Sequence, residues 1–470
     1  MDSNSDDIRN TGLTRRQLLA TLGAGAVSVA AAACAAAPTA APTTAPAAKP
    51  ASTTAPAGGA TPAAASPPVS APAVLKGTTL SFLGGTYFVP AAQELFVSQL
   101  KEWGKENGVN VSADFLNWPD LQAKIGAAVQ AGAGADLFQF WPGWAFLYAD
   151  NLVDVTDIVD PIEKARGGYY DWVSRTVKVK GRWLAVPTGM TNGAINYRTS
   201  YLKQAGADKF PDTWDELFAV GKKLKAMGKP MGQALGHSLG DPPDFAYPYM
   251  WSNGAMEVES DGKTIAFNKP QFVDAMKKFI QAYKDCYDET GLSWDDSANN
   301  RAFLSDQISV TYNGSSIYET AKKQNPDIAA DMDHADMPKG PAGRFYHMGG
   351  HSFGLLKNSK NVSGAKEFLK WWFDPKRFDE WIHIQGVYQL PPTKDWEKDP
   401  MWTKDPKQAP FARQSQFGRT MGHAGDPSDK ATLAKSKYIV VDTFAQAVTD
   451  GNAEAAIKWG ADQLQLIYGS

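Results

Sequence analysis

From about residue 76 onward, short runs rich in β-branched and aromatic residues alternate with longer stretches whose apolar residues recur at helical spacing. The first runs predict strands over 79–83, 109–116 and 136–140. A helix is expected over 90–105, and Pro119 opens the next one at a first-turn position, where its missing N–H costs nothing. Strands that alternate with helices indicate an α/β fold with a largely parallel sheet.

The same alternation continues along the rest of the chain. Residues 181–188 predict a strand that leaves a first domain, and 192–197 one that begins a second. Thr213 and Glu216 form a capping box that opens a helix through Met227. Further strands are expected at 308–312 and after the glycine-rich segment 348–355, a turn at 250–254, and helices over 272–286, 363–373, 375–385 and 435–450.

Four polar or aromatic residues follow predicted strands directly. Tyr87 lies in the loop after the first strand, Trp118 follows the second, and Gln139 and Trp141 end the third. In open α/β sheets the ligand crevice lies at the carboxyl ends of the strands. We therefore expect these side chains to meet at a binding site.

Residues 1–75 differ in composition from the rest and are set apart from the fold. Arg15 and Arg16 precede a modest apolar run, 18–33, which is too short for a spanning helix and ends at Cys34. This pattern predicts a Tat-like signal peptide over 1–34, with ordinary secretory export as the alternative. Lipidation is expected at Cys34, and plain cleavage nearby would instead release a soluble product.

Residues 35–75 consist almost wholly of Ala, Pro, Thr, Ser and Gly, which predicts a disordered tether. The remaining length of about 395 residues exceeds what one hydrophobic core organises, so two domains are expected. The chain has 47 basic against 50 acidic residues and no basic cluster, which argues against nucleic acid as a partner. With Cys34 lipidated, Cys286 has no disulfide partner.

Several short motifs stand in an order that resembles the family 1 extracellular solute-binding proteins, the carbohydrate-type receptors of ABC importers. They are Ala185-Val186-Pro187, Asn196-Tyr197-Arg198, the segment 211–217, Trp251-Ser252-Asn253-Gly254, Ala302-Phe303-Leu304 and Gly349-Gly350-His351-Ser352. The resemblance implies a two-lobed periplasmic-binding-protein-like fold (type II) in which a hinge joins two mixed sheets flanked by helices. It implies a first lobe of 76–187 plus 305–350 and a second of 188–304 plus 351–470.

The resemblance also implies a function. We expect a non-enzymatic monomer that is exported to the outer face of the cytoplasmic membrane or the periplasm and contacts the membrane only through its lipid anchor. Its partners would be a carbohydrate and the permease subunits of an ABC transporter, and no cofactor is expected. The sequence departs from the family at 313–316, where Asn-Gly-Ser-Ser replaces a frequent Gly-x-Trp and removes an aromatic platform.

A sugar presents apolar C–H faces and a rim of hydroxyls, so a receptor needs aromatic platforms and polar groups that pair with hydroxyls. The predicted ligand-binding residues are Tyr87, Trp118, Trp141 and Trp251 as platforms, Gln139, Thr188 and Asn313 as hydrogen-bonding groups, and Gly350, His351 and Tyr388 in loops that reach the cleft. His347 and His351 stand four apart, but the glycines between them disfavour a helix, so no metal site is expected.

Two alternatives stay open. A secreted glycoside hydrolase would need two carboxylates about 5 to 9.5 Å apart, and the notable acidic pairs are Asp295 with Asp296 and Glu257 with Glu259. The same fold would otherwise carry a polyamine, a polyol, a phosphosugar or a metal. Polyamines demand several convergent acids, whereas the predicted binding residues are mostly neutral.

Overall fold

The computed structural model describes residues 75–469. The predicted export signal at Arg15 and Arg16, the predicted lipidation at Cys34 and nearly all of the predicted tether lie outside these residues, and they stay predictions.

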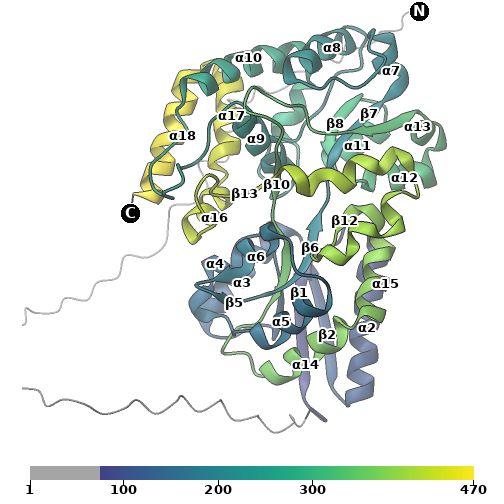
Figure 1. The fold of residues 1–470 in the computed structure, drawn as a ribbon, viewed down its shortest axis with the longest axis vertical. Helices are drawn as coiled ribbons and strands as arrows, with labels where there is room; N and C mark the ends of the chain where they lie inside the picture. The colour runs from purple at the N-terminus through teal and green to yellow at the C-terminus, as the bar shows by residue number, and fades with distance from the viewer. Residues whose placement is uncertain (1–74, 470) are drawn as a thin grey trace, which may run out of the picture. The chain divides into compact units, whose positions relative to one another are not determined.

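The larger sheet has six strands in the order β12-β6-β11-β3-β1-β2 (Figure 1). Their bounds are β1 Thr79–Gly85, β2 Asn110–Leu116, β3 Leu137–Phe140, β6 Val186–Thr191, β11 His351–Gly354 and β12 Gln389–Leu390. β1 pairs in parallel with β2 and β3, as expected from the strand–helix alternation. β11 runs antiparallel between β3 and β6, and β12 antiparallel to β6, so the sheet is mixed.

Helices cover this sheet because each buries one apolar face. α2 turns Phe96, Leu100 and Trp103 inward, and the Phe96 ring lies 5.6 Å from that of Phe353 in β11. The elements around the sheet are α2 Pro90–Asn107, α3 Trp118–Ala131, α4 Trp144–Leu147, η1 Ala149–Asn151, α5 Thr156–Ala165, α6 Asp171–Val177, β4 Lys178–Val179, β5 Arg182–Trp183, α14 Val362–Trp372, α15 Pro375–Gln385 and η3 Gly386–Tyr388.

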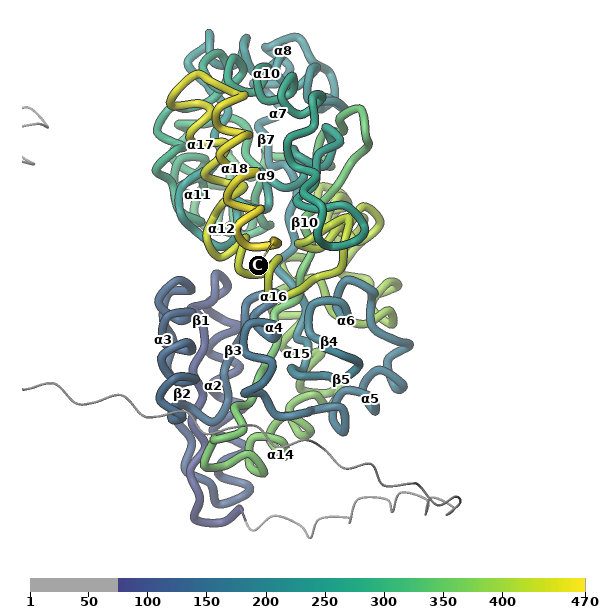
Figure 2. The backbone as a smooth tube through the Cα atoms, turned by 90° about the vertical axis from the view of Figure 1, so that its left-hand side faces the viewer, coloured from purple at the N-terminus to yellow at the C-terminus, as the bar shows by residue number. Residues whose placement is uncertain are grey.

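The second sheet has three strands in the order β8-β7-β9. β7 (Ala194–Arg198) lies between β8 (Val310–Asn313) and β9 (Met332–Ala335), and both pairings are antiparallel, unlike the largely parallel sheet expected. Around it lie α7 Thr199–Gln204, α8 Trp214–Ala226, α9 Asp241–Ser252, α10 Pro270–Cys286, η2 Glu289–Ser293, α11 Ala298–Leu304, α12 Ser316–Gln324, α13 Pro326–Asp331, α17 Ile439–Asp450 and α18 Ala453–Tyr468. Figure 2 shows α17 and α18 with α9 and α11, apart from β1, β2 and α2.

The remaining elements follow β11 or connect the two sheets. A short ribbon pairs β10 (Tyr346–Met348) with β13 (Gly418–Thr420) in parallel. The other segments are η4 Lys394–Lys398, η5 Pro400–Trp402, η6 Pro406–Phe417 and α16 Asp429–Ser436. The predicted helix over 435–450 is in fact the end of α16 followed by α17, and Tyr438 adopts a left-handed φ of 57° between them.

The fold has two lobes, as predicted, and we call the part around the six-stranded sheet the first lobe and the part around the three-stranded sheet the second lobe. The strand pairing places two segments in the opposite lobe from the one expected. β8 and β9, expected in the first lobe, pair with β7, whereas β11, expected in the second lobe, fills the gap between β3 and β6. Hydrogen bonding between strands distant in sequence decides this, and no local pattern reports it.

The turn expected at 250–254 begins later, at Asn253, because α9 continues through Ser252. Asp241–Ser252 form α9, with Trp251 in its last turn. Pro242 and Pro243 stand in the first turn, where proline is tolerated, but Pro248 lies inside the helix. The capping box at Thr213 is confirmed, since its side chain accepts from the N–H of Glu216 and the Glu216 carboxylate accepts from the Thr213 N–H.

Candidate functional site

A pocket opens at the carboxyl ends of β1 and β3, beside the start of β11. β3 pairs in parallel with β1 and antiparallel with β11, and the pocket lies where this pairing changes. This is the position expected for a ligand crevice, at the carboxyl ends of the strands in an open α/β sheet. Its walls are Thr86, Tyr87, Phe88, Trp118, Gln139, Trp141, Thr191, His351, Trp381, Gln385, Tyr388 and Gln389. We call this the aromatic pocket, because half of these side chains are Trp, Tyr or Phe.

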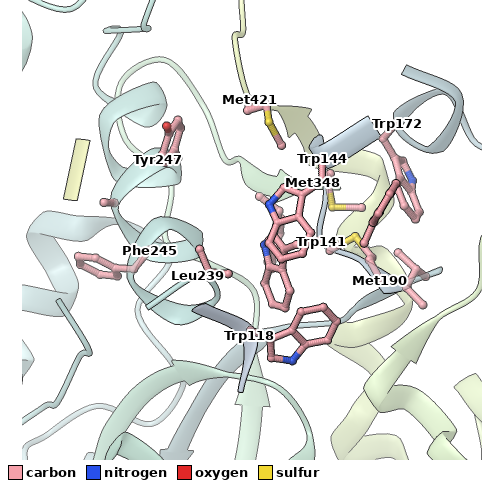
Figure 3. Packing of buried hydrophobic residues seen from close by; sticks show 14 of the residues in the cluster. Trp118, Trp141, Trp144, Trp172, Met190, Leu239, Phe245, Tyr247, Met348 and Met421 are labelled. Carbon is pink, nitrogen blue, oxygen red and sulfur yellow. The ribbon is translucent and has the colours of Figure 1, made fainter. Parts of the chain in front are cut away.

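Three rings form its floor. The Trp118 and Trp141 centroids lie 4.7 Å apart with planes at 69°, and the His351 imidazole stacks on Trp118 at 5.2 Å. Figure 3 shows Trp118, Trp141 and Trp144 close together, with Leu239 of the second lobe nearby. Burial lowers the pKa of His351 to about 3, so its ring is neutral at physiological pH. A neutral imidazole offers one donor and one acceptor.

Glycines allow the Trp118 ring to approach the strand backbone. A Cβ at Gly85 would lie 2.3 Å from the indole of Trp118, far inside contact distance. The Gly85 N–H donates to Oε1 of Gln139 at 3.1 Å, which fixes that amide in the pocket wall. Trp118 itself is oriented by the start of α3, where the Asn117 side chain accepts from the N–H of Asp120 at 3.0 Å.

The polar groups of the pocket are neutral. Threonine hydroxyls and glutamine amides come from β3, β6, α15 and β12 and the loop after β1. The indole N–H of Trp141 is buried and donates to no described residue. An unpaired buried donor costs free energy that a ligand acceptor would recover. The pocket can therefore hold a neutral molecule that has apolar faces and a polar rim.

Six of the ten predicted ligand-binding residues line the aromatic pocket: Tyr87, Trp118, Gln139, Trp141, His351 and Tyr388. The other four do not line it. Thr188 lies in β6, where its carbonyl accepts from the Gln389 amide at 3.2 Å, and Gly350 joins β10 to β11. Trp251 packs 5.4 Å from Tyr247 inside the second lobe, and Asn313 ends β8. The binding roles of all ten residues stay predictions.

Part of the pocket wall was not predicted from the sequence. Trp381 and Gln385 lie one turn apart on α15, and the Trp381 ring lies 6.1 Å from that of Tyr87. Their four-residue spacing is the only signal in the sequence, and it is equally typical of core positions. Thr86, Phe88, Thr191 and Gln389 also line the pocket, next to residues that were predicted.

Three carboxylates that the sequence analysis did not bring together lie beside the pocket. Asp241 and Asp244 stand in the first turn of α9, and Asp296 accepts from the Asp241 N–H at 2.8 Å. Burial, together with the Asp296 charge, raises the pKa of Asp241 well above its usual range. Asp244 pairs at 2.6 Å with His347, whose pKa burial lowers. We call Asp241, Asp244 and Asp296 the acidic cluster.

Within 75–469, no helix is long and apolar enough to cross a membrane. In the same range, no group of three or more His, Cys, Asp or Glu side chains is placed to hold a metal ion.

A profile of the family described as bacterial extracellular solute-binding protein matches residues 98–410, about two thirds of the chain. The chain belongs to this family. The resemblance to extracellular solute-binding proteins, drawn from the sequence motifs, is thereby confirmed. Members of the family are binding proteins of transporters, and the family name places them outside the cytoplasm.

Two curated relatives are similar in sequence to this chain. The solute-binding protein is 24% identical over 309 residues to a binding protein of Brucella abortus, covering 63% of this chain and 72% of that one. It is 22% identical over 248 residues to an ABC transporter-binding protein of Deinococcus radiodurans, covering 49% and 56%.

Two solved structures share the two-lobed fold. The maltose-bound MalE3 of T. maritima has a TM-score of 0.70 at 20% identity and covers 83% of this chain and 99% of its own. A sugar transporter of Arthrobacter chlorophenolicus A6 with bound laminaribiose has a TM-score of 0.72 at 16% identity, with the same coverage. At these identities the likeness establishes the fold of the solute-binding protein and nothing more.

Proposed function

We propose that the protein is the receptor of an ABC importer and captures a sugar or short oligosaccharide in the aromatic pocket. The observation that carries this proposal is the composition of the pocket wall, in which six aromatic rings alternate with neutral hydroxyl and amide groups. Ring faces pack against the C–H faces of a pyranose, and the amides pair with its hydroxyls. The solved relatives with bound maltose and laminaribiose support the same ligand class.

Capture works by hinge closure. The chain crosses between lobes directly after β6, and Thr191 at the end of β6 lines the pocket. A ligand that contacts both lobes favours the closed form by its extra affinity for that form, and the permease subunits read closure as occupancy. The receptor acts as a monomer and breaks no bond. Export and a lipid at Cys34 hold it at the outer face of the cytoplasmic membrane.

A thermal-shift screen over mono- and disaccharides, polyols, polyamines and phosphosugars tests the ligand class. A ligand at about 100 times its Kd stabilises the folded state by about 2.7 kcal/mol. With an unfolding entropy of about 2.1 cal/mol/K per residue, that is a rise of about 3 °C in Tm for this chain. Neutral saccharides should raise Tm, and the Trp141→Ala variant should lose most of the rise.

Two results would refute the proposal of a receptor for neutral sugars. One is a screen in which only phosphosugars or polyamines raise Tm. The other is release of product from chromogenic glycosides, which would make the protein a hydrolase. The anchor is tested separately by mass spectrometry of the mature N-terminus, where an unmodified Cys34 would remove the membrane attachment and leave the binding proposal intact.

A further inference from the structure

Asp241 and Asp296 of the acidic cluster receive their hydrogen bonds from neutral groups alone. Both oxygens of Asp296 accept hydrogen bonds, from the Ser238 hydroxyl and from the N–H groups of Gly240 and Asp241. One oxygen of Asp241 accepts from the amides of Asn299 and Asn313, at 2.7 and 3.0 Å. All of these donors are neutral.

Two carboxylate oxygens of the cluster stay open. The second oxygen of Asp241 accepts from no described residue, and neither does the second oxygen of Asp244, whose first oxygen pairs with His347. No Lys or Arg among residues 75–469 lies within ion-pair distance of Asp241 or Asp296. Asp241, Asp244 and Asp296 are half-buried, and carboxylates that are partly withdrawn from water favour a cationic partner.

The nearest buried cation does not fill this gap. The Lys435 ammonium lies 5.6 Å above the Trp141 ring and donates to the Leu239 carbonyl at 3.3 Å, without reaching a carboxylate. It acts on the carboxylates only from a distance, and burial lowers its pKa to about 8. The positive end of α9 also favours the acids of its first turn, by about 0.3–1 kcal/mol each. Within 75–469, no Lys or Arg forms an ion pair with any of the three carboxylates.

The acidic cluster adjoins the aromatic pocket along two routes. Asn313, which binds Asp241, precedes Gly314, where a Cβ would lie 2.8 Å from the ring of Tyr388 in the pocket wall. On the other side, Trp141 of the pocket lies under Lys435, which binds the carbonyl of Leu239, two residues before Asp241. Figure 3 shows Leu239 near Trp141.

The pocket independently carries signs of an absent guest with polar groups. The Trp141 indole N–H is buried without a partner, and His351, only 9% exposed, makes no side-chain hydrogen bond to a described residue. The aromatic faces nearby attract cations, an interaction worth about 2 kcal/mol when desolvated. Since no group of three or more His, Cys, Asp or Glu side chains within 75–469 is placed to hold a metal ion, we consider an organic cation.

We propose that the bound saccharide carries a protonated amine, which Asp241 and Asp244 hold at their open oxygens while its ring lies among Trp118, Trp141 and Trp381. The ligand is then an amino sugar or an amine-bearing oligosaccharide. This rests on the proposed carbohydrate receptor and narrows its substrate class. Polyamine ligands were disfavoured because the residues predicted to bind were mostly neutral. In the fold, three acids do come together beside the pocket.

Calorimetric titration of the full folded chain with matched sugars tests the proposal. The probes are D-glucosamine, D-glucose and N-acetyl-D-glucosamine, the corresponding galactose and mannose sets, and deacetylated chitobiose against cellobiose. Wild type is compared with Asp241→Asn, which can keep the acceptor for Asn299 and Asn313 but removes the charge. Asp450→Asn, at an exposed position in the last turn of α17, is the matched control.

The amine of at least one set should bind about tenfold or more tightly than its neutral and acetylated partners. Asp241→Asn should reduce this preference to about threefold or less and leave the affinity for the neutral sugar within about twofold. Asp450→Asn should keep the full preference. Neutral sugars that bind as tightly as amines, or a preference that survives Asp241→Asn, would overturn the amine proposal and leave the carbohydrate receptor standing. If no saccharide binds, the proposed function fails and the amine proposal fails with it.

Discussion

Gly85→Ala is the sharpest test of how the aromatic pocket is built. The new Cβ would lie 2.3 Å from the Trp118 indole, whereas ordinary contacts begin at 3.4 Å, so the ring must move by roughly 1 Å. That movement disturbs the contacts of Trp118 with Trp141 and His351, whose centroids lie at 4.7 and 5.2 Å. Overpacking of this kind costs about 1–3 kcal/mol.

With an unfolding entropy of about 2.1 cal/mol/K per residue, this cost lowers Tm by about 1–4 °C. The near-UV circular dichroism should also change, because two close indoles alter their geometry. Saccharide affinity should fall by about tenfold, since the ring platform is displaced.

Gly126→Ala is the matched control, in the helix α3 that carries Trp118. Its Cβ would meet only the Tyr148 hydroxyl at 3.8 Å, an ordinary contact, and alanine is favoured in a helix by up to about 1 kcal/mol. Gly126→Ala should therefore leave the near-UV spectrum and saccharide affinity unchanged. Unaltered Tm, spectrum and affinity in Gly85→Ala would refute the reasoning that the glycine positions Trp118.

Two further predictions concern buried charges. Burial raises the pKa of Glu257 to about 7, above an unfolded value of about 4.3. The carboxyl therefore binds protons more tightly in the folded state, and the wild-type protein loses stability as pH rises from about 4.5 to about 7. Glu257→Gln, which can still accept from the Gly422 N–H, should be more stable than wild type by a margin that grows across this range in urea titrations; a constant margin would contradict the assignment. Arg166 is buried and forms ion pairs with Asp379 at 2.7 Å and with Asp395 at 3.0 Å. Because each of these carboxylates is about a third exposed, Arg166→Met should lower the free energy of unfolding by only about 1–3 kcal/mol. Adding Asp379→Asn to Arg166→Met should recover part of that loss. If the effects of the two substitutions on the free energy of unfolding simply add, the ion pair contributes nothing to stability.

Local patterns were enough to predict most of the first lobe. The three strands that begin it pair as expected because strand–helix alternation brings successive strands side by side in one sheet. The same logic found Tyr87, Trp118 and Trp141, which stand directly after these strands and therefore share an edge of the sheet.

Contacts between segments distant in sequence determine what could not be predicted. β11 enters the first sheet more than 150 residues after β6, and its apolar run reads equally well as a strand of either sheet. Trp381 reaches the pocket because α15 packs against α2, with its indole N–H donating to the Ala92 carbonyl at 3.1 Å. Asp241 and Asp296 are 55 positions apart and meet only because Asp296 caps the start of α9.

The crystal structure of the protein with its tightest-binding saccharide tests the central claim most directly. Our account predicts a pyranose ring packed among Trp118, Trp141 and Trp381, with its hydroxyls hydrogen-bonded to the amides of Gln139 and Gln389. A saccharide bound elsewhere on the protein, with the aromatic pocket holding only solvent, would contradict it.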